Sequence, residues 1–380
     1  MRNYLKVYDV KLKTIGPLYI GFGDEIDKKG YIYDKSDNKV YIPNINKMYS
    51  YFLKNKLEEK FEDYMINNKI GNFIDWLNNN GVGKDEWKKW TDYILDCREA
   101  SDIIKNSTVK IKTFVKDSLG EVYIPGSSLK GALRTIILGK ELIDNNKSFS
   151  KYCSKIDEID KNHKKYNRKT YLSKEISEIE CEVFNKVNRK DVKKTSMVND
   201  IMSGVRVSDS KIISKDNLIL CRKIDESVKG TEKSLNILRE CIKPETEISF
   251  TITVDTTIFK EDIIKLIHTS INSFGENYDK NFNSKYKSGD KLDDTMFYLG
   301  GGSGFVSKTV LYPLLSDRKD AVKMVSSVID KTLNKTLSIQ HKHKNDVNLG
   351  VSPHTIKKTR YNYEKYSFGL CSINIEEIDL

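Results

Sequence analysis

A short stretch in the first half of the chain has the residue types of an anion-binding site, in the sequence VYIPGSSLKGALRT (residues 122–135). A Pro-Gly turn ends an extended segment, and Ser127 or Ser128 can cap the helix that follows. The first-turn N–H groups and the helix dipole attract an anion. Lys130 and Arg134 are four residues apart, so they share one helix face beside that site. The chemistry that this spacing favours is phosphate binding.

The same stretch also fits a helix whose only role is packing, because Leu129, Leu133 and Ile136 form an apolar stripe. Capped amphipathic helices with exposed Lys and Arg on the other face are common. The spacing is not G-x-x-x-x-G-K-[ST], which excludes a P-loop. The residues alone therefore leave packing and phosphate binding both open.

A second glycine-rich turn occurs in YLGGGSGFVSKT (residues 298–309), where four glycines fall within Gly300 to Gly304 and Lys308 follows. Glycine permits positive φ and a close approach of the backbone to a ligand. The spacing is not that of a dinucleotide-binding fold, and a simple tight turn is the alternative. Two such turns, each after a strand and each followed by a lysine, favour one extended surface for a sugar–phosphate backbone.

Residues for catalysis are scarce. Metal-independent RNA cleavage commonly uses histidine as acid and base. His341 and His343 lie on a segment expected to be extended and lack the further ligands that a metal site needs. His354 follows Pro353, where a structural hydrogen bond is favoured over catalysis. No carboxylate pair or nucleophile–base arrangement can be argued from the spacing, so we predict no catalytic residue, no metal and no cofactor.

Composition gives weaker guidance. The 380 residues carry a net charge of +11 with a pI near 9.0, which favours a polyanionic partner. Lysine outnumbers arginine 55 to 10, a bias that weakens the charge argument but makes each arginine position informative. The six cysteines are scattered without C-x-x-C, which indicates isolated thiols. No apolar run is long enough for a membrane span and no signal-peptide core is present, so we expect a cytoplasmic protein.

The elements that must position these turns have the pattern of an α+β fold. Strands are expected at 4–15, in a hairpin turning at Asp37-Asn38, and in TEISFTITVDT, whose apolar and polar residues alternate. Helical spacing covers 46–66 and 72–97. The lysine-rich stretch 143–195 shows little periodicity, and we expect a mobile insertion that folding does not need.

The quoted segments VYIPGSSLKGALRT and LGGGSGFVSKTV, with VSPHTIKKTR and FGLCSI near the C-terminal end, resemble the signature segments of the RAMP superfamily of CRISPR proteins. The whole pattern is similar to the fifth-subunit family of type III-A Csm effector complexes. The resemblance implies two ferredoxin-like (RRM-like) modules, which we assign to residues 1–256 and 257–380. Insertions are then expected at about 46–100, helical, and at 143–195, lysine-rich.

The resemblance also implies a function: a non-catalytic, crRNA-binding subunit that caps the crRNA 3′-end side of the backbone filament. The expected partners are crRNA, a neighbouring RAMP backbone subunit, the small subunit, target RNA indirectly, and host nucleases that mature crRNA. The expected RNA-binding residues are Ser127, Ser128, Lys130, Gly131, Arg134, Gly301, Gly302, Ser303, Gly304 and Lys308. Two alternatives stay open. One is a RAMP endoribonuclease that cuts precursor CRISPR RNA, with His354 or a tyrosine and a lysine as catalysts. The other is a protein-only scaffold.

Overall fold

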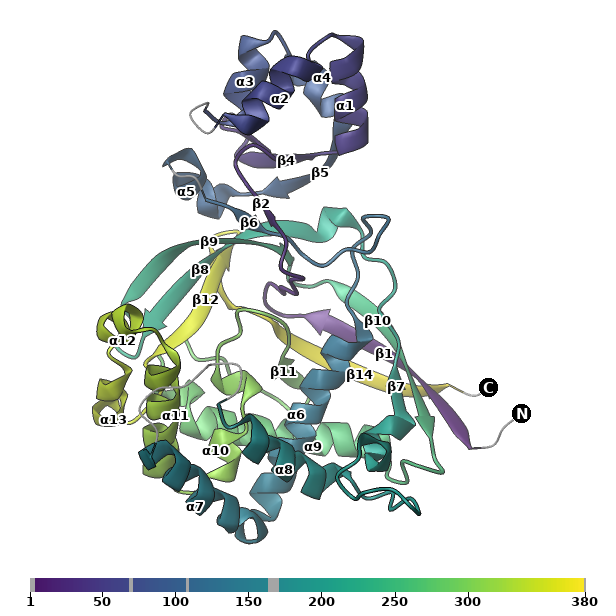
Figure 1. Cartoon of the computed structure of the whole chain (residues 1–380), viewed down its shortest axis with the longest axis vertical. Helices are drawn as coiled ribbons and strands as arrows, with labels where there is room; N and C mark the ends of the chain where they lie inside the picture. The colour runs from purple at the N-terminus through teal and green to yellow at the C-terminus, as the bar shows by residue number, and fades with distance from the viewer. Residues whose placement is uncertain (1–3, 68–70, 107–108, 163–170, 379–380) are drawn as a thin grey trace.

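Three antiparallel-rich sheets form the framework of the computed structural model, which describes residues 4–67, 71–106, 109–162 and 171–378 (Figure 1). The first sheet has five strands in the order β11 (Met296–Tyr298), β14 (Leu370–Ile378), β1 (Leu5–Thr14), β10 (Glu247–Asp255) and β7 (Val205–Val207). All of its neighbouring strands are antiparallel. Apolar residues alternate along β10, and Ile248, Phe250 and Ile252 are buried, as their spacing predicts.

The second sheet stands beside the first and has six strands in the order β13 (Glu364–Ser367), β12 (Thr355–Tyr361), β8 (Leu218–Ser227), β9 (Glu232–Ile242), β6 (Ile111–Lys112) and β2 (Glu25–Ile26). A third sheet comprises β3 (Ile32–Asp34), β4 (Lys39–Pro43) and β5 (Thr91–Asp96). The predicted hairpin is present as β3–β4, with Asn38 at positive φ in its turn.

The helices form two groups. The cap at the top of Figure 1 contains α1 (Ile45–Lys54), α2 (Glu58–Ile66), α3 (Phe73–Asn79) and α4 (Lys84–Trp87), and α5 (Ser101–Asn106) follows β5. The layer at the bottom contains α6 (Gly126–Asp144), α7 (Asn146–Asn162), α8 (Ser173–Phe184), α9 (Ile263–Asn281), α10 (Leu311–Leu314) and α11 (Arg318–Thr332). The short helices α12 (Lys335–His341) and α13 (Asp346–Leu349) lie beside α11.

The chain is therefore a mixed α/β protein in which distant segments share sheets. Strand β1 pairs with β10 on one side and with β14, near the C-terminal end, on the other. Strand β12 likewise pairs with β8. Helix α6 packs against α9, and these two helices contact the edge strands β7 and β11 respectively. The helix that follows the first turn therefore contacts the edge strand β7, and the second turn follows the opposite edge strand, β11.

One predicted helix is in part a strand. Residues 72–97 were expected to be helical throughout, but Thr91–Asp96 form β5 and pair with β4. The apparent continuation of the helical spacing through Ile94 is misleading, because that side chain is exposed. The preceding helices do pack as predicted, around a separate core that includes Phe52, Trp76 and Trp87.

The lysine-rich stretch is folded where the structure describes it, which contradicts the expectation of a mobile insertion. Its described part contains α7 and α8. Phe149, Tyr152 and Ile156 lie one turn apart on α7 and are buried in the main core. The apolar stripe is narrow and surrounded by lysines, so its periodicity is masked by composition. Residues 163–170 lie outside the described part.

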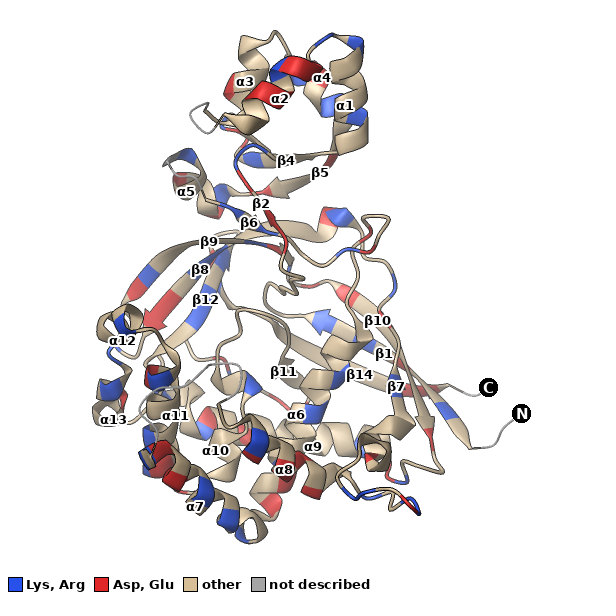
Figure 2. Cartoon of the chain, viewed as in Figure 1, with Lys and Arg blue, Asp and Glu red and all other residues tan. Residues whose placement is uncertain are grey.

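Charge is distributed rather than gathered, and Figure 2 shows both signs interleaved along α7 and α8. Ion pairs such as Lys151–Glu182 and Lys155–Glu178 join these two helices. Some lysines of this stretch are therefore paired with glutamates. Within the described residues, no helix combines the length and apolarity that crossing a bilayer requires.

Candidate nucleic-acid interface

The Pro-Gly turn starts helix α6, and its glycine is required by packing. A Cβ on Gly126 would lie 2.3 Å from the backbone oxygens of Val207 and Ser208, so only glycine permits this approach to the end of β7. The Gly126 N–H donates to Oδ1 of Asp209 at 2.8 Å. The helix therefore begins at Gly126 with no cap from the two serines, and an acidic side chain already occupies part of the expected anion site.

Ser127 and Gly131 are exposed and Ser128 is half-buried, while Leu129, Leu133 and Ile136 are buried as predicted. The packing half of the sequence interpretation is thus confirmed. Binding of RNA by the exposed helix start stays a prediction.

Lys130 is not the free surface cation that the sequence suggests. Its Nζ donates to the backbone oxygens of Met202 at 2.8 Å and Val205 at 2.7 Å. Burial lowers the pKa of Lys130, and the nearby Asp200 carboxylate offsets part of that effect. This lysine anchors the 3₁₀ turn Ile201–Gly204 and the start of β7 to helix α6.

Arg134 is engaged in the same way. Its Nη1 donates to Oδ2 of Asp200 at 2.7 Å, and its Nη2 lies 3.4 Å from Oε2 of Glu180 on α8. The guanidinium carbon is 3.9 Å from the ring centroid of Phe184, a cation–π contact. Arg134 therefore joins α6 to α8, and the expectation that it is exposed is wrong.

We predict that Lys130→Ala and Arg134→Ala each destabilise the fold by about 1–3 kcal/mol, because each removes a donor from partly buried acceptors. Thermal and urea unfolding measure this effect. The control is Lys265→Ala, an exposed lysine on α9, which should change stability by less than about 0.5 kcal/mol. Unchanged unfolding of both α6 variants would mean that these side chains are free in solution.

The glycine-rich loop follows β11 and packs on Tyr19. Gly300, Gly302 and Gly304 have φ values of 75°, 95° and 101°, a region that L side chains rarely adopt. The Gly301 N–H donates to the Tyr19 backbone oxygen at 2.6 Å. The loop therefore needs its glycines for conformation and for contact with the chain, whatever it binds.

The serines of this loop are used internally. Ser303 is buried and its Oγ donates to the Gly300 oxygen at 3.2 Å. The Oγ of Ser307 donates to the backbone oxygen or to the Oγ of Ser303, each at 3.2 Å. Lys308 ends the following 3₁₀ turn, Val306–Lys308, and its side chain is exposed. Partial desolvation and the charge of Arg239 lower the pKa of Lys308.

Arg239 on β9 is the main feature that the sequence interpretation missed. A Cβ on Gly302 would lie 3.1 Å from its Nη1. The guanidinium is held between the rings of Tyr19 and Phe368, at 5.2 Å and 5.4 Å from their centroids. Its Nε and Nη1 are buried and have no acceptor within the described residues. The positive charge of this guanidinium would attract an anion to the loop.

Two further cations lie near the loop. Lys357 on β12 lies beside Gly304, because a Cβ added to Gly304 would be 3.8 Å from Cγ of Lys357. Its Nζ lies 3.0 Å from Oδ1 of Asp225, which is also 3.5 Å from Nζ of Lys223. Burial lowers the pKa of Lys223, and the positive charge of Lys357 lowers it further. One carboxylate thus faces two lysines, and we name Arg239, Lys308, Lys357 and Lys223 the loop cation cluster.

The two predicted segments lie apart on the first sheet, and their contact with one extended RNA backbone stays a prediction. The α6 start adjoins β7, and the glycine loop follows β11, at opposite edges of the five-stranded sheet. Four inter-strand spacings of about 4.8 Å separate these edges by about 19 Å. The scarcity of arginine was the signal that could have identified Arg239, which lies in the strand segment NILREC.

A mixed α/β chain that places a glycine-rich loop beside clustered cations has the architecture of a RAMP protein. The RAMP superfamily model matches residues 11–369, and the chain belongs to that superfamily. Within it, the chain resembles proteins named Csm5, as the sequence motifs predict.

Two such relatives align over 100% of both chains. The "CRISPR system Cms protein Csm5" of Streptococcus thermophilus is 28% identical over 395 residues, and that of Mycobacterium tuberculosis strain H37Rv is 26% identical over 401 residues. The fold is shared with solved structures. A chain of the "Cryo-EM structure of Csm-crRNA-target RNA ternary complex in type III-A CRISPR-Cas system" gives a TM-score of 0.63 at 17% identity, covering 97% of this chain and 100% of that chain. The "Crystal structure of T.onnurineus Csm5" gives 0.57 at 18% identity, covering 95% and 99%.

Proposed function

We propose that the chain is a non-catalytic, crRNA-binding subunit of a type III-A CRISPR (Csm) effector complex. The observation that carries this proposal is the loop cation cluster, where an arginine without protein acceptors adjoins a glycine-rich loop. Its support from comparison is the full-length similarity to Csm5 relatives. The fold is also shared with a chain of a complex that, by its description, contains crRNA and target RNA.

In this proposal the subunit caps the crRNA 3′-end side of the backbone filament and supports crRNA maturation and antiviral RNA interference in the cytoplasm. Its partners are crRNA, the neighbouring RAMP backbone subunit and the small subunit, with target RNA contacted indirectly. Host nucleases that mature crRNA are further partners. Phosphates are the groups that the cluster is suited to recognise, because lysine and arginine carry the opposite charge and donate hydrogen bonds to phosphate oxygens.

The proposal also includes two ferredoxin-like modules. The first sheet supports one of them, because β1, α6, β7, β10, α9 and β14 follow the β-α-β-β-α-β order of that motif. The second would be built on β8, β9, β12 and β13. The boundary between residues 256 and 257 lies in the connection from β10 to α9. This boundary stays a proposal. Strands β12 and β14 lie beyond residue 256, but they pair with β8 and β1, which lie before it.

The test is incubation of the pure protein with labelled precursor CRISPR RNA in EDTA, with retention and cleavage measured together. We expect retained, uncut RNA, with affinity falling by about 0.7 log units per phosphate contact for each tenfold rise in salt. The Nδ1 of His354 lies 2.5 Å from Oδ1 of Asp346, and replacing His354 tests the endoribonuclease alternative.

Two outcomes would contradict this expectation. Cleavage that His354→Ala abolishes would favour the RAMP endoribonuclease. Retention that does not respond to salt, or no retention by the assembled complex, would favour a protein-only scaffold.

A further inference from the structure

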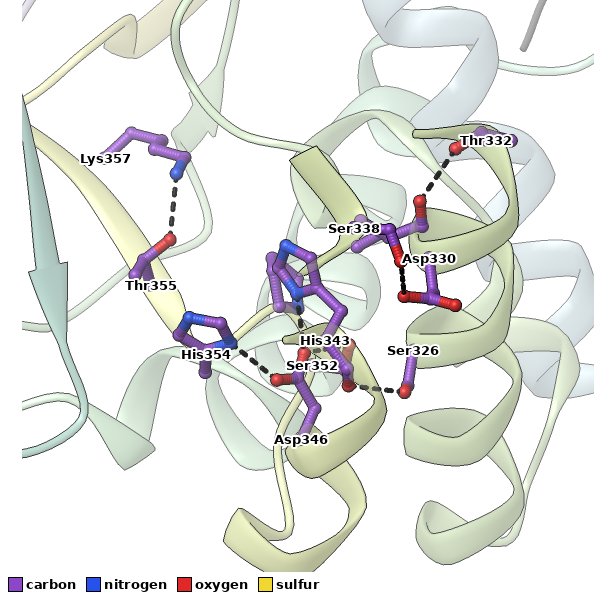
Figure 3. A network of polar contacts seen from close by, with 12 residues as sticks. Ser326, Asp330, Thr332, Ser338, His343, Asp346, Ser352, His354, Thr355 and Lys357 are labelled. Atoms are coloured by element: carbon purple, nitrogen blue, oxygen red, sulfur yellow. Dashed lines mark hydrogen bonds and ion pairs between the residues drawn. The ribbon is translucent and has the colours of Figure 1, made fainter. Parts of the chain in front are cut away.

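Two histidines and an aspartate converge at the junction between the helical layer and strand β12. His343 begins the 3₁₀ turn His343–Asn345, Asp346 begins α13, and His354 directly precedes β12. The Nδ1 of His343 lies 2.9 Å from Oδ2 of Asp346, and the Nδ1 of His354 lies 2.5 Å from its Oδ1. Figure 3 shows both imidazoles directed at the one carboxylate. Their ring centroids are 4.7 Å apart.

This arrangement differs from the extended segment expected at His341 and His343. The chain there is helical, with α12 ending at His341 and a 3₁₀ turn following. The fold brings Asp346 and His354 to His343, and these are the further ligands that spacing alone could not provide.

The charge of the cluster points to a cation. Asp346 is fully buried, and its partners within the described residues are the two imidazoles and the hydroxyl of Ser352, none of which carries a fixed positive charge. A buried carboxylate is costly unless its negative charge is balanced. A positive charge at the point where both imidazole nitrogens and the carboxylate meet would offset that cost.

The donor set defines the kind of ion. One ligand atom from each of the three residues lies within 4.8 Å of the others. Two imidazole nitrogens with one carboxylate oxygen are ligands typical of zinc sites with three protein ligands and one open position. Mg²⁺ and Ca²⁺ prefer all-oxygen sites. We propose that His343, Asp346 and His354 bind one Zn²⁺-class ion per chain.

The surroundings hold these ligands in place, as outer partners do in metal sites. The Oγ of Ser352 donates to Oδ2 of Asp346 at 2.7 Å, and the Oγ of Ser326 donates to the His343 backbone oxygen at 2.7 Å. His343 is buried, whereas the side chain of His354 is 24% exposed and offers a route for the ion. A bound ion would fix the segment that connects α11 to β12, the strand that carries Lys357.

The experiment uses the full-length chain stripped with EDTA, dialysed, and titrated with ZnCl₂ by calorimetry and with CoCl₂ by visible absorption. We expect one equivalent bound and the absorption of tetrahedral Co²⁺. His354→Ala should weaken the affinity by roughly 100-fold or more, since loss of an outer partner alone costs 10–100-fold. The isosteric Asp346→Asn should do the same, and circular dichroism checks that both variants fold.

The control is His268→Ala, a half-buried histidine on α9, which should leave binding unchanged. No zinc binding by the unmodified chain would overturn the proposal and leave a hydrogen-bonded network only. Zinc binding that His354→Ala and Asp346→Asn both retain in full would also overturn it, since the ligands would then be elsewhere, such as the free thiols. Neither result depends on RNA binding, so this proposal and the proposed function fail separately.

Discussion

Replacing Phe149 with alanine is expected to lower the free energy of unfolding by about 3–5 kcal/mol, the cost of a large cavity in a packed core. Phe149 is 5% exposed and belongs to the main hydrophobic core. Its helix, α7, is tied to the helical layer at both ends. Near its start, the Nδ2 of Asn146 donates to the Leu314 oxygen at 3.0 Å. Near its end, Asp160 accepts from Ser327 at 2.8 Å and pairs with Lys331.

The measurement is urea unfolding followed by circular dichroism, with Lys147→Ala as the matched control. Lys147 is exposed on the same helix two residues earlier, so its loss should cost less than about 0.5 kcal/mol. A chain that lacks residues 143–195 should fail to unfold cooperatively, because the cut removes both α7 and α8 from the core. Cooperative folding of that shortened chain would restore the view, based on composition, that this stretch is dispensable.

The parts of the fold that were predictable are those whose signal is local. The alternation in β10 and the stripe of Leu129, Leu133 and Ile136 on α6 follow from side-chain periodicity alone. The turn at Asn38 follows from local chemistry, whereas the need for glycine at Gly126 comes from its contact with the distant residues Val207 and Ser208. The α7 stripe was also local, but three apolar residues among many lysines are too few to stand out.

The site was less predictable, because its contacts link distant parts of the chain. Lys130 meets backbone oxygens more than seventy residues away, and Arg134 meets Asp200. Nothing in VYIPGSSLKGALRT reveals that these cations are already satisfied. In the same way, Asp346 joins His354 to His343 only because the chain turns between α13 and β12.

The loop cation cluster depends on similar long-range contacts, and Arg239 is its distinguishing member. Its Nε and Nη1 have no acceptor within the described residues, whereas Lys357 and Lys223 share Asp225. A buried donor without an acceptor costs stability. Such a cost is expected where a ligand completes the site, so Arg239 should contribute more to RNA binding than to folding.

Arg239→Met is therefore expected to weaken RNA binding by about 10- to 100-fold, the equivalent of one charge-assisted phosphate contact. The salt slope of log affinity should fall by about 0.7. The melting temperature should stay the same or rise, because methionine keeps the packing between Tyr19 and Phe368 and removes the unsatisfied donors.

Arg222→Met is the matched control. It removes the same charge from the neighbouring strand β8, where Arg222 pairs with Asp102 at 2.7 Å, so it should lower stability and leave RNA affinity nearly unchanged. If Arg239→Met binds RNA as tightly as the unmodified chain, with the same salt slope, the phosphates do not contact the glycine loop. The exposed start of α6 then becomes the place to test.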